Sequence, residues 1–553
     1  MLRLEDATRR AFLRASTLSC LVAASASGLL TLRPARAQPG VGNPQFVPDL
    51  EVQLRAREDH VQILHGEPTR VWRYDGKVLK GDPGSLGFLS NGYLPVLRVQ
   101  RGQKVKIDLV NELAEPTIIH WHGLYVPAAM DGHPRNAIAT GQHYVYEFEV
   151  LNRAGTYWFH AHPDGRTGAQ IYFGQAGLLI VADDEEAALG LPSGAYDVPL
   201  VIQDRVLDGQ NQFTYLSDGD GGMMGRGMMG SGGMMGPGMM GGSGMMGQGM
   251  MGGDGMGQMM ARMMGFLGDR ILVNGKPDFV LPVATRAYRL RLLNASNTRI
   301  YKLGWSDRSP LAIIGTDGGL LERPVMRPYV TLSPAERADI WVDFSQRSIG
   351  TELTLQSLTF DGEMAMGGMM GNASLPNGAS FPVLKVRVEQ RVNTKAELPK
   401  RLASLPVALP RDAINARAPK VFNITMGMMV WGINGRSFDM DKVTKTETVR
   451  RNSTELWEFR NEKSMMLMAH SMHVHGLQFR VLGRTVLPDF LPAHRTVAAG
   501  LVDDGWKDTV LLMPGERIRL LLRFEHYAGM FLYHCHMLEH EDTGLMRNYM
   551  IET

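Results

Sequence analysis

The amino-acid sequence predicts an all-β chain built from several sandwiches, on two main observations. Short segments in which apolar and polar residues alternate recur from about Phe46 to the C-terminus, a pattern typical of half-buried strands. Gly, Pro, Asn and Asp separate these segments, and long amphipathic helices are few. The 553 residues correspond to about three or four domains at roughly 150 residues each, which is compatible with several sandwiches.

The predicted strands follow one another along the whole chain, at residues 103–110, 155–160, 177–181, 288–293, 339–344 and 517–524 among others. Two stretches between them, Asp183 to Gly194 and Arg391 to Pro419, collect charges, glycine and proline, and we interpret them as linkers. The expected domains are therefore 45–185, 190–390 and 391–553.

The N-terminus predicts export. Thr8-Arg-Arg-Ala-Phe-Leu-Arg14 is a twin-arginine pattern, an apolar run extends from Leu18 to Leu32, and Ala35-Arg-Ala37 offers a cleavage site. The run is too short and too rich in Ser and Ala for a stable membrane span. We therefore expect residues 1–37 to be a signal peptide and the mature protein to be periplasmic. Cleavage removes Cys20, so Cys535 remains as a single thiol.

The overall charge excludes one class of partner. A net charge of +2, without blocks of like charge, argues against nucleic-acid binding, which needs a concentrated basic surface. An apolar content of 44% is enough for a sizeable core. We expect a monomer with neither a nucleic-acid partner nor stable membrane insertion.

The predicted middle domain contains an insert rich in methionine and glycine, at residues 218–265. Methionine pairs recur from Met223 to Met264, and Met364–Met370 repeats the style. The glycines lower helix propensity and no face shows a period, so we expect a structureless loop. Thioether sulfur is a soft ligand suited to Cu(I), which favours soft-metal capture; an inert flexible insertion is the alternative.

Ten histidines lie in four short clusters: His120-Trp-His122, His160-Ala-His162, His470-Ser-Met-His473-Val-His475, and His534-Cys-His536 followed by His540. On a strand, residues i and i+2 point to the same face, so each His-x-His motif presents two imidazoles side by side. Four such pairs would gather eight imidazoles, too many for one tetrahedral zinc ion. The pattern indicates a multinuclear site for a transition metal that prefers imidazole.

Cys535 must face the other side of its strand, because it lies between His534 and His536. There it can meet His470 and His540, which gives two imidazoles and one thiolate. This set is the trigonal arrangement of blue copper sites. The covalent neighbours of the cysteine would then give electrons a through-bond route to the larger cluster.

From about residue 45 to the C-terminus, these four clusters resemble, in order, those of the multicopper oxidases, in particular periplasmic cuprous oxidases and bacterial laccases. The resemblance implies three cupredoxin-like Greek-key β-sandwich domains and four copper ions per chain. It implies a type 1 copper in the third domain and a trinuclear centre between the first and third. It also implies four one-electron oxidations coupled to reduction of O2 to two waters.

The resemblance assigns roles residue by residue, as follows: His470, Cys535 and His540 for type 1 copper; His120 and His473 for type 2; His122, His160 and His536 for one type 3 copper; His162, His475 and His534 for the other. Asp131 and Glu541 match catalytic carboxylates that relay protons, while the alternative is that both are merely solvated acids.

Some positions depart from the family pattern. Ser471 stands where proline is usual, which concerns local loop geometry. Leu545 stands ten residues after Cys535, where bacterial members commonly have an axial methionine, and Met546 follows one step later. A slip of one residue turns a side chain to the other face, so we predict a type 1 copper without an axial ligand and with a high potential.

The reductant is less well defined by the sequence. Met426 and Met468 match methionines that bind substrate copper in cuprous oxidases, but the acidic residue expected four places before the type 1 histidine is Met466. Our first hypothesis is oxidation of Cu(I) in copper tolerance. The second is a laccase acting on phenols or aromatic amines. The third is a non-catalytic copper-binding envelope protein, which the complete ligand set disfavours.

Overall fold

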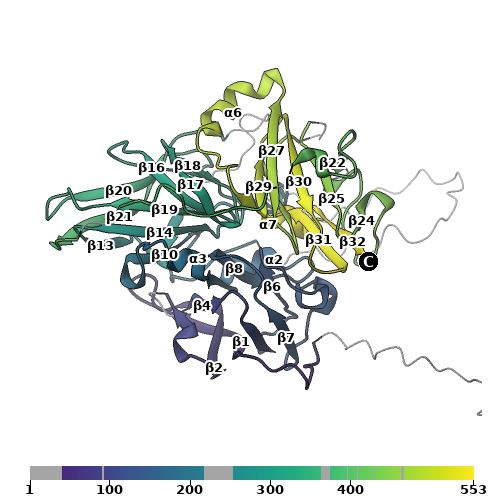
Figure 1. The fold of residues 1–553 in the computed structure, drawn as a ribbon, viewed down its shortest axis with the longest axis horizontal. Helices are drawn as coiled ribbons and strands as arrows, with labels where there is room; N and C mark the ends of the chain where they lie inside the picture. Colours follow the sequence, from purple (N-terminus) through teal and green to yellow (C-terminus); the bar gives the residue numbers. More distant parts are fainter. Residues whose placement is uncertain are drawn as a thin grey trace, which may run out of the picture.

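The computed structural model describes residues 40–89, 93–216, 253–362, 374–394, 397–407, 409–427, 429–462 and 466–553. The expected signal peptide, most of the insert and the shorter methionine-rich stretch at Met364–Met370 lie outside the described residues. The prediction of an all-β chain is confirmed, since six sheets account for most of the rest (Figure 1).

Two sheets form the first sandwich. One contains β1 (Leu50–Val61), β2 (Thr69–Lys80), β5 (Lys104–Asn111) and β7 (His143–Glu149). The other contains β3 (Leu86–Phe88), β4 (Pro95–Gln100), β6 (Ile119–His122), β8 (Gly155–Ala161) and β9 (Ala176–Ala182). In β5 every second residue is buried, as the alternation in its sequence predicts. By contrast β8 is buried along its whole length.

The middle sandwich occupies residues 197–390. Its larger sheet contains β10 (Asp197–Arg205), β11 (Arg270–Val273), β12 (Lys276–Pro277), β14 (Ala287–Asn294), β16 (Leu311–Thr316), β17 (Gly319–Arg327) and β19 (Arg337–Asp343). Its smaller sheet contains β13 (Val280–Ala284), β15 (Tyr301–Trp305), β18 (Val330–Leu332), β20 (Glu352–Ser357) and β21 (Phe381–Gln390).

The third sandwich occupies residues 420–552. One sheet contains β22 (Lys420–Gly427), β23 (Val430–Ile433), β25 (Thr454–Arg460), β27 (Phe479–Val486), β28 (Trp506–Lys507) and β30 (Glu516–Arg523). The other contains β24 (Thr448–Arg450), β26 (His470–Val474), β29 (Thr509–Leu512), β31 (Gly529–Cys535) and β32 (Met546–Glu552).

The three sandwiches repeat one topology. In each, the first strand pairs in parallel with a later strand of its sheet: β1 with β5, β10 with β14 and β22 with β25. The opposite sheets repeat this feature, with the parallel pairs β4 with β9, β13 with β21 and β24 with β32. Parallel neighbours cannot be joined by a hairpin, so each sandwich needs crossovers between its two sheets. Each sandwich encloses an apolar core of its own.

Helices are short and lie between the sandwiches or at their ends. They are α2 (Thr167–Phe173), α3 (Asp184–Ala187), α5 (Gly253–Met264), α6 (Leu491–Ala498) and α7 (Leu538–Asp542). Helix α2 of the first sandwich contacts α7 of the third, and Figure 1 shows these two sandwiches packed against each other at that point. No helix in the described part of the chain is both long and apolar enough to cross a membrane.

Helix α5 corrects one expectation. We expected the whole insert, residues 218–265, to lack regular structure because of its glycines, but Gly253–Met264 near its end form a helix. The glycines stand mainly in the first half of the helix, and its last turn places Met263 and Met264 in the apolar core of the third sandwich. Burial of two methionine side chains offsets the unfavourable propensity of glycine, about 1 kcal/mol for each residue.

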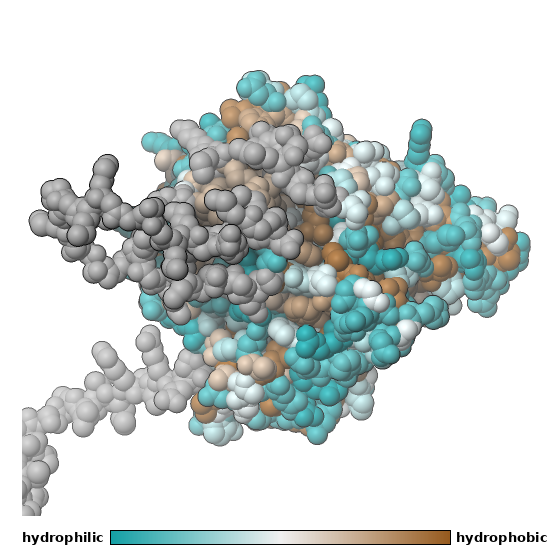
Figure 2. All heavy atoms as spheres, turned by 180° about the vertical axis from the view of Figure 1, so that it is seen from behind, coloured by the Kyte–Doolittle hydropathy of each residue, from teal (hydrophilic) through white to brown (hydrophobic). Residues whose placement is uncertain are grey.

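Polar residues of the alternating strands cover much of the outer surface. Figure 2, seen from behind, shows hydrophilic side chains over most of the coloured surface, with apolar atoms in scattered spots. Some large apolar side chains remain exposed in connecting segments, such as Val41, Val407 and Ile414.

Candidate metal centre

Strand ends bring the four histidine clusters together. Strand β6 carries His120 and His122, and β8 carries His160 with His162 just beyond its end. In the third sandwich β26 carries His470 and His473, and His475 follows it. Strand β31 ends with His534 and Cys535, His536 follows, and His540 lies on α7. All ten imidazoles and the thiol are at most 1% exposed.

Strand register explains why the imidazoles meet. In the first sandwich His120 is paired with His160 across the antiparallel strands β6 and β8. In the third, His473 is paired with His534 across β26 and β31. Directly opposite residues of an antiparallel pair point to the same face. The two faces meet between the sandwiches, so eight imidazoles from two domains share one buried space.

Within this space the imidazoles form three sets. His120 and His473 face each other with their Nε2 atoms 3.3 Å apart. His160 Nε2 lies 3.3 Å from His122 Nδ1 and 3.2 Å from His536 Nε2. His534 Nε2 lies 3.4 Å from His162 Nε2 and 3.0 Å from His475 Nε2.

These separations are those of ligands on a common ion. Two nitrogens about 2.0–2.1 Å from one metal, at a tetrahedral angle, stand about 3.3–3.4 Å apart. The facing nitrogens of each set lie against one another, and His162 Nε2 also lies near the carboxylate of Glu541. The donor set is imidazole throughout, which suits copper and related transition metals.

The thiol forms a separate site on the other face of β31. Cys535 Sγ lies 3.6 Å from His470 Nδ1 and 3.7 Å from His540 Nδ1. A sulfur about 2.3 Å and a nitrogen about 2.0 Å from one ion would stand about 3.6–3.8 Å apart, so the three atoms can share a metal. Burial raises the pKa of the Cys535 thiol to about 12, and a bound cation would be needed to hold it as thiolate.

The residues at the axial position follow from the pairing of β31 with β32. Met546 is opposite His534 in the register, so its side chain shares the face of His534 and points away from Cys535. Leu545 is wholly buried in the same apolar cluster as Cys535, and its main-chain oxygen accepts a hydrogen bond from the Cys535 amide. The register therefore turns Met546 away from the thiol, and the absence of an axial ligand stays a prediction.

Burial favours the neutral form of nine of these imidazoles. It lowers the pKa of His120, His122, His160, His470, His475 and His536 well below the ordinary value of 6.5. It also lowers the pKa of His162 to about 4, and that of His473 and His540 to about 3. A neutral imidazole has one free lone pair, which is the form that binds a metal.

Outer partners fix which nitrogen carries the proton. His120 Nδ1 donates to the main-chain oxygen of Asp131, and His473 Nδ1 to that of Asp508, both at 2.7 Å. His475 Nδ1 donates to Asp131 Oδ2 at 2.7 Å, and His534 Nδ1 lies 3.0 Å from Glu541 Oε2. In each case the proton is held away from the shared space, so Nε2 presents its lone pair to the metal.

The two predicted carboxylates lie beside the cluster and are buried, not solvated. Burial raises the pKa of Asp131 well above its usual 3.8. Burial also tends to raise the pKa of Glu541, but His534 and His162 beside it outweigh this effect and lower that pKa to about 2. Glu541 Oε1 stands 3.4 Å from His162 Nε2. The pKa values of the two acids are therefore shifted in opposite directions, although both acids lie beside the same cluster.

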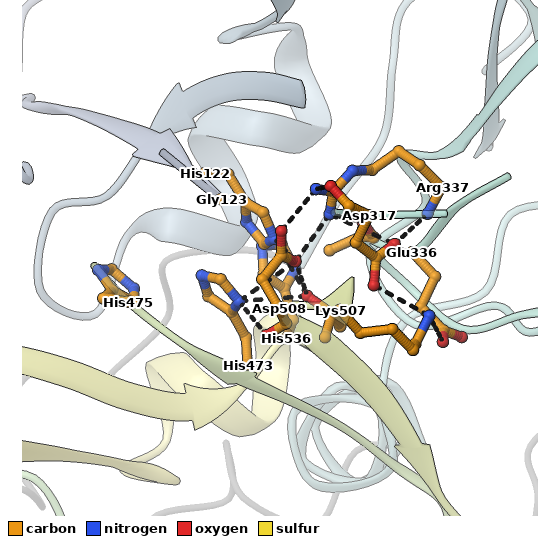
Figure 3. Close-up of polar contacts among 12 residues, drawn as sticks. His122, Gly123, Asp317, Glu336, Arg337, His473, His475, Lys507, Asp508 and His536 are labelled. Carbon is orange, nitrogen blue, oxygen red and sulfur yellow. Dashed lines mark hydrogen bonds and ion pairs between the residues drawn. The ribbon is translucent and has the colours of Figure 1, made fainter. Parts of the chain in front are cut away.

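Sequence reasoning missed Asp508. It lies between β28 and β29, is wholly buried, and accepts a hydrogen bond from His122 Nε2 through Oδ1 at 3.0 Å. Burial tends to raise the pKa of Asp508, but Arg337 outweighs burial and holds that pKa below its usual value. Figure 3 shows this carboxylate between the histidines and Arg337. A signal existed in Trp506-Lys-Asp-Thr-Val-Leu-Leu512, where two adjacent charges interrupt an apolar stretch.

The methionines expected to bind substrate copper lie near the thiol site. Met468 is wholly buried and Met426 is 8% exposed, and both belong to the apolar cluster that contains Cys535. Met466 packs against the same cluster, whereas Met465 lies outside the described residues. Trp431 of β23 contacts both imidazoles of the thiol site, with ring centroids 4.9 Å from His470 and 4.9 Å from His540.

Comparisons with known proteins agree with this geometry. Two sequence profiles described as multicopper oxidase match residues 84–186 and 413–553. A laccase from Bacillus subtilis is 30% identical over 532 residues, covering 89% of this chain and 92% of the relative. The multicopper oxidase mco of Staphylococcus aureus is 29% identical over 467 residues, covering 84% of this chain and 83% of the relative.

Among solved structures, the McoA multicopper oxidase from the hyperthermophile Aquifex aeolicus matches with a TM-score of 0.70 and 30% identity, over 92% of this chain and 97% of the other. This likeness confirms the expectation of three cupredoxin domains. The histidine clusters are consistent with the copper sites of such enzymes. The chain therefore belongs to the multicopper oxidase family, and it is an oxidase that reduces O2 with electrons from a reductant.

Proposed function

We propose that this oxidase takes its electrons from Cu(I) and serves copper tolerance in the periplasm, after twin-arginine export. The observation that carries the proposal is the position of α5, which forms the C-terminal end of the methionine-rich insert. Trp431 Nε1 donates to the main-chain oxygen of Met263 at 2.9 Å, and the Trp431 ring contacts both histidines of the thiol site. Soft thioether ligands are thus attached next to the site that accepts electrons.

The side chains of α5 support the same proposal. Met259 is 43% exposed, while Met260 packs against the cluster that contains Cys535. Together with the partly buried Met466, these thioethers would offer Cu(I) a series of soft ligands between solvent and the thiol site. Met426 and Met468 would lie at the inner end of this route, in the role that we predict for them as ligands of substrate copper.

Four copper ions per chain would be held by the sets described above. His470, Cys535 and His540 would hold the type 1 ion, and the three imidazole sets would hold the type 2 ion and the type 3 pair. When bound, copper supplies the one-electron steps: four Cu(I) ions are oxidised to Cu(II) while one O2 takes up four electrons and four protons to give two waters. Asp131 and Glu541, buried against the cluster ligands, are the residues we propose to relay those protons.

A laccase acting on phenols or aromatic amines is the second candidate. The Bacillus subtilis relative is named a laccase, and the apolar Leu545 favours a high potential, which helps either reductant. However, His470 and His540 are both wholly buried and lie against Trp431. A phenol or aromatic amine would therefore have to transfer its electron through Trp431 or α5. A non-catalytic copper-binding protein is disfavoured because all ten histidines and the cysteine are present.

Two changes to the insert separate the candidates. Deleting residues 218–252 removes most of its methionines but keeps α5, and changing Met259 and Met260 to leucine removes sulfur at nearly constant volume. If Cu(I) is the reductant, kcat/KM for Cu(I) falls about tenfold or more in the combined variant, while oxidation of a phenolic donor persists or rises. Unchanged Cu(I) kinetics would contradict the proposal, and phenol oxidation far faster than Cu(I) oxidation in the unaltered enzyme would favour the laccase.

A further inference from the structure

The middle sandwich contributes none of the ten clustered histidines, yet one of its side chains binds a carboxylate that contacts two of them. Arg337, at the start of β19, is wholly buried. A buried guanidinium is costly unless all its donors are paired, so its surroundings reveal what it holds.

All five N–H groups of Arg337 have acceptors. They are Thr156 O for Nε at 3.0 Å, Ala335 O and Asp508 Oδ1 for Nη1 at 3.0 and 2.8 Å, and Asp317 O and Asp508 Oδ2 for Nη2 at 3.0 and 2.6 Å. Thr156 belongs to the first sandwich, Ala335 and Asp317 to the middle one and Asp508 to the third. One planar group therefore joins the three domains, and lysine with its three donors could satisfy at most three of these five contacts.

Asp508 in turn accepts hydrogen bonds from two candidate copper ligands that belong to different domains. Its Oδ1 accepts from His122 Nε2 at 3.0 Å, and its main-chain oxygen accepts from His473 Nδ1 at 2.7 Å. Thr509 supports the arrangement, because its hydroxyl donates to Asp508 Oδ1 at 2.8 Å. In Figure 3 Asp508 lies between the two imidazoles and the arginine.

His122 differs from the other seven imidazoles of the cluster. It faces its set with Nδ1, whereas the other facing atoms are Nε2. In a neutral imidazole, the hydrogen bond made by one nitrogen decides which nitrogen is free for a metal. Asp508 Oδ1 accepts from Nε2 at 3.0 Å and the Thr509 hydroxyl, which itself donates to Asp508, lies 3.1 Å from Nε2. This pair keeps the proton on Nε2 and leaves the Nδ1 lone pair free, so this ligand depends on the orientation of Asp508.

The surroundings confine Asp508 to that orientation. Gly123, which follows His122, has φ of +85°, and a Cβ there would lie 2.3 Å from Asp508 Oδ2 and 3.0 Å from Arg337 Nη2. Lys507 Nζ binds Asp317 Oδ2 and Glu336 Oε1, each at 3.0 Å, while Asp317 Oδ1 stands 3.6 Å from Arg337 Nη1, farther than either carboxylate oxygen of Asp508. Arg337 is thereby left to hold Asp508 with both Nη atoms.

We propose that Arg337 is a positioning residue for the trinuclear copper centre: through its two-point contact with Asp508 it fixes the tautomer of His122 and the position of His473. The middle domain would then act in oxygen reduction without supplying a ligand. The alternative is that the ion pair only fastens the three domains together. In that case its loss would affect stability, but not the spectra of copper bound at this centre.

The test compares Arg337→Lys and Asp508→Asn with Arg289→Lys as a matched control. Arg289 is also buried in the middle sandwich and makes a two-point ion pair, with Asp339, but contacts no histidine of the cluster. Each purified, copper-loaded variant is measured for copper content, the blue absorption of the thiol site, the electron paramagnetic resonance of type 2 copper, kcat and thermal unfolding.

We expect both test variants to keep the blue absorption, to show altered type 2 resonance or reduced copper content, and to lose about 10–100-fold in kcat, as loss of an outer-shell partner commonly causes. The control should unfold at lower temperature with unchanged type 2 resonance. Test variants with the control's spectra and kcat would overturn the proposal. So would failure of both to fold while the control folds, because the pair would then serve folding alone.

Discussion

At the scale of single residues, Cys535 shows how strand alternation separates two metal sites. Its Sγ faces His470 and His540, while His534 and His536 on either side of it face the imidazole cluster. Successive residues of a strand point to opposite faces, so one tripeptide serves both sites. The thiol and the cluster are consequently joined through covalent bonds, which no arrangement of separate loops would ensure.

Replacing Cys535 by serine tests whether the thiol and the neighbouring histidines serve separate metal sites. The hydroxyl oxygen is a hard ligand and a poor substitute for thiolate on copper. We expect the blue absorption to disappear and oxidase activity to fall to background, while the type 2 resonance remains. Absorption spectra and electron paramagnetic resonance of the loaded variant check this. A blue Cys535→Ser variant would refute the assignment of the thiol site, and so would a wild-type enzyme that is colourless when loaded.

The axial position allows a second test with a matched pair. Leu545 shares the apolar cluster of Cys535, whereas Met546 shares the face of His534. Leu545→Met should supply a weak axial donor, stabilise Cu(II) and lower the potential of the type 1 copper, as measured by redox titration of the blue band. Met546→Leu should leave that potential unchanged. A fall in potential for neither variant, or a rise for Met546→Leu, would contradict the axial assignment.

At the scale of elements, the β26–β31 ladder and helix α5 have different functions. The ladder sets the pairing of His473 with His534, and a slip by one residue would turn the imidazoles out of the shared space. Helix α5 is held by its buried methionines Met263 and Met264, by the hydrogen bond from Trp431 to the Met263 oxygen and by contacts with α7. The first element fixes ligands directly, whereas α5 packs against Trp431 and against α7, the helix that carries His540.

Trp431→Phe is expected to weaken the docking of α5. Loss of one buried hydrogen bond costs about 1 kcal/mol, so the helix should open about fivefold more often. Faster hydrogen exchange at the amides of residues 253–264 would report this. Trp341→Phe is the control, because Trp341 Nε1 has no partner among the described residues. Equal exchange in both variants would show that the Trp431 bond does not hold the helix.

At the scale of the whole molecule, the candidate copper ligands come from the first and third sandwiches. The metal site is therefore complete only when these two domains pack against each other. Ten buried histidines meet between or within these domains, and they are consistent with the copper sites of multicopper oxidases. In the copper-free enzyme the buried histidines stay neutral in the folded state, and this lowers the free energy of unfolding at acid pH.

The copper-free enzyme should therefore be acid-labile. The pKa of His162 is lowered to about 4 and that of His473 to about 3, both chiefly by burial. Between pH 6.5 and these values only the unfolded chain takes up a proton, so stability falls as pH falls, by roughly 2 kcal/mol for each such histidine at pH 5. Urea unfolding of the copper-free enzyme at pH 7 and pH 5 measures this loss. Equal midpoints would contradict it, and copper loading should reduce the difference.

The sequence by itself determined the fold class and which residues are candidate ligands. Alternating strands require only local periodicity, and His-x-His fixes two imidazoles on one face wherever the strand lies. The insert shows the limit of local reasoning. Glycines argued against a helix at Gly253–Met264, but burial of its last methionines against the third sandwich decided otherwise.

Only the tertiary structure decided which imidazoles share a set and which groups orient them. His120 meets His473 across a domain boundary, and their sequence separation of 353 residues carries no local signal. The same holds for Arg337 and Asp508, whose separation is 171 residues. Burial pairs such charges because an unpaired charge in the interior is too costly, and that cost exists only once the three domains have packed.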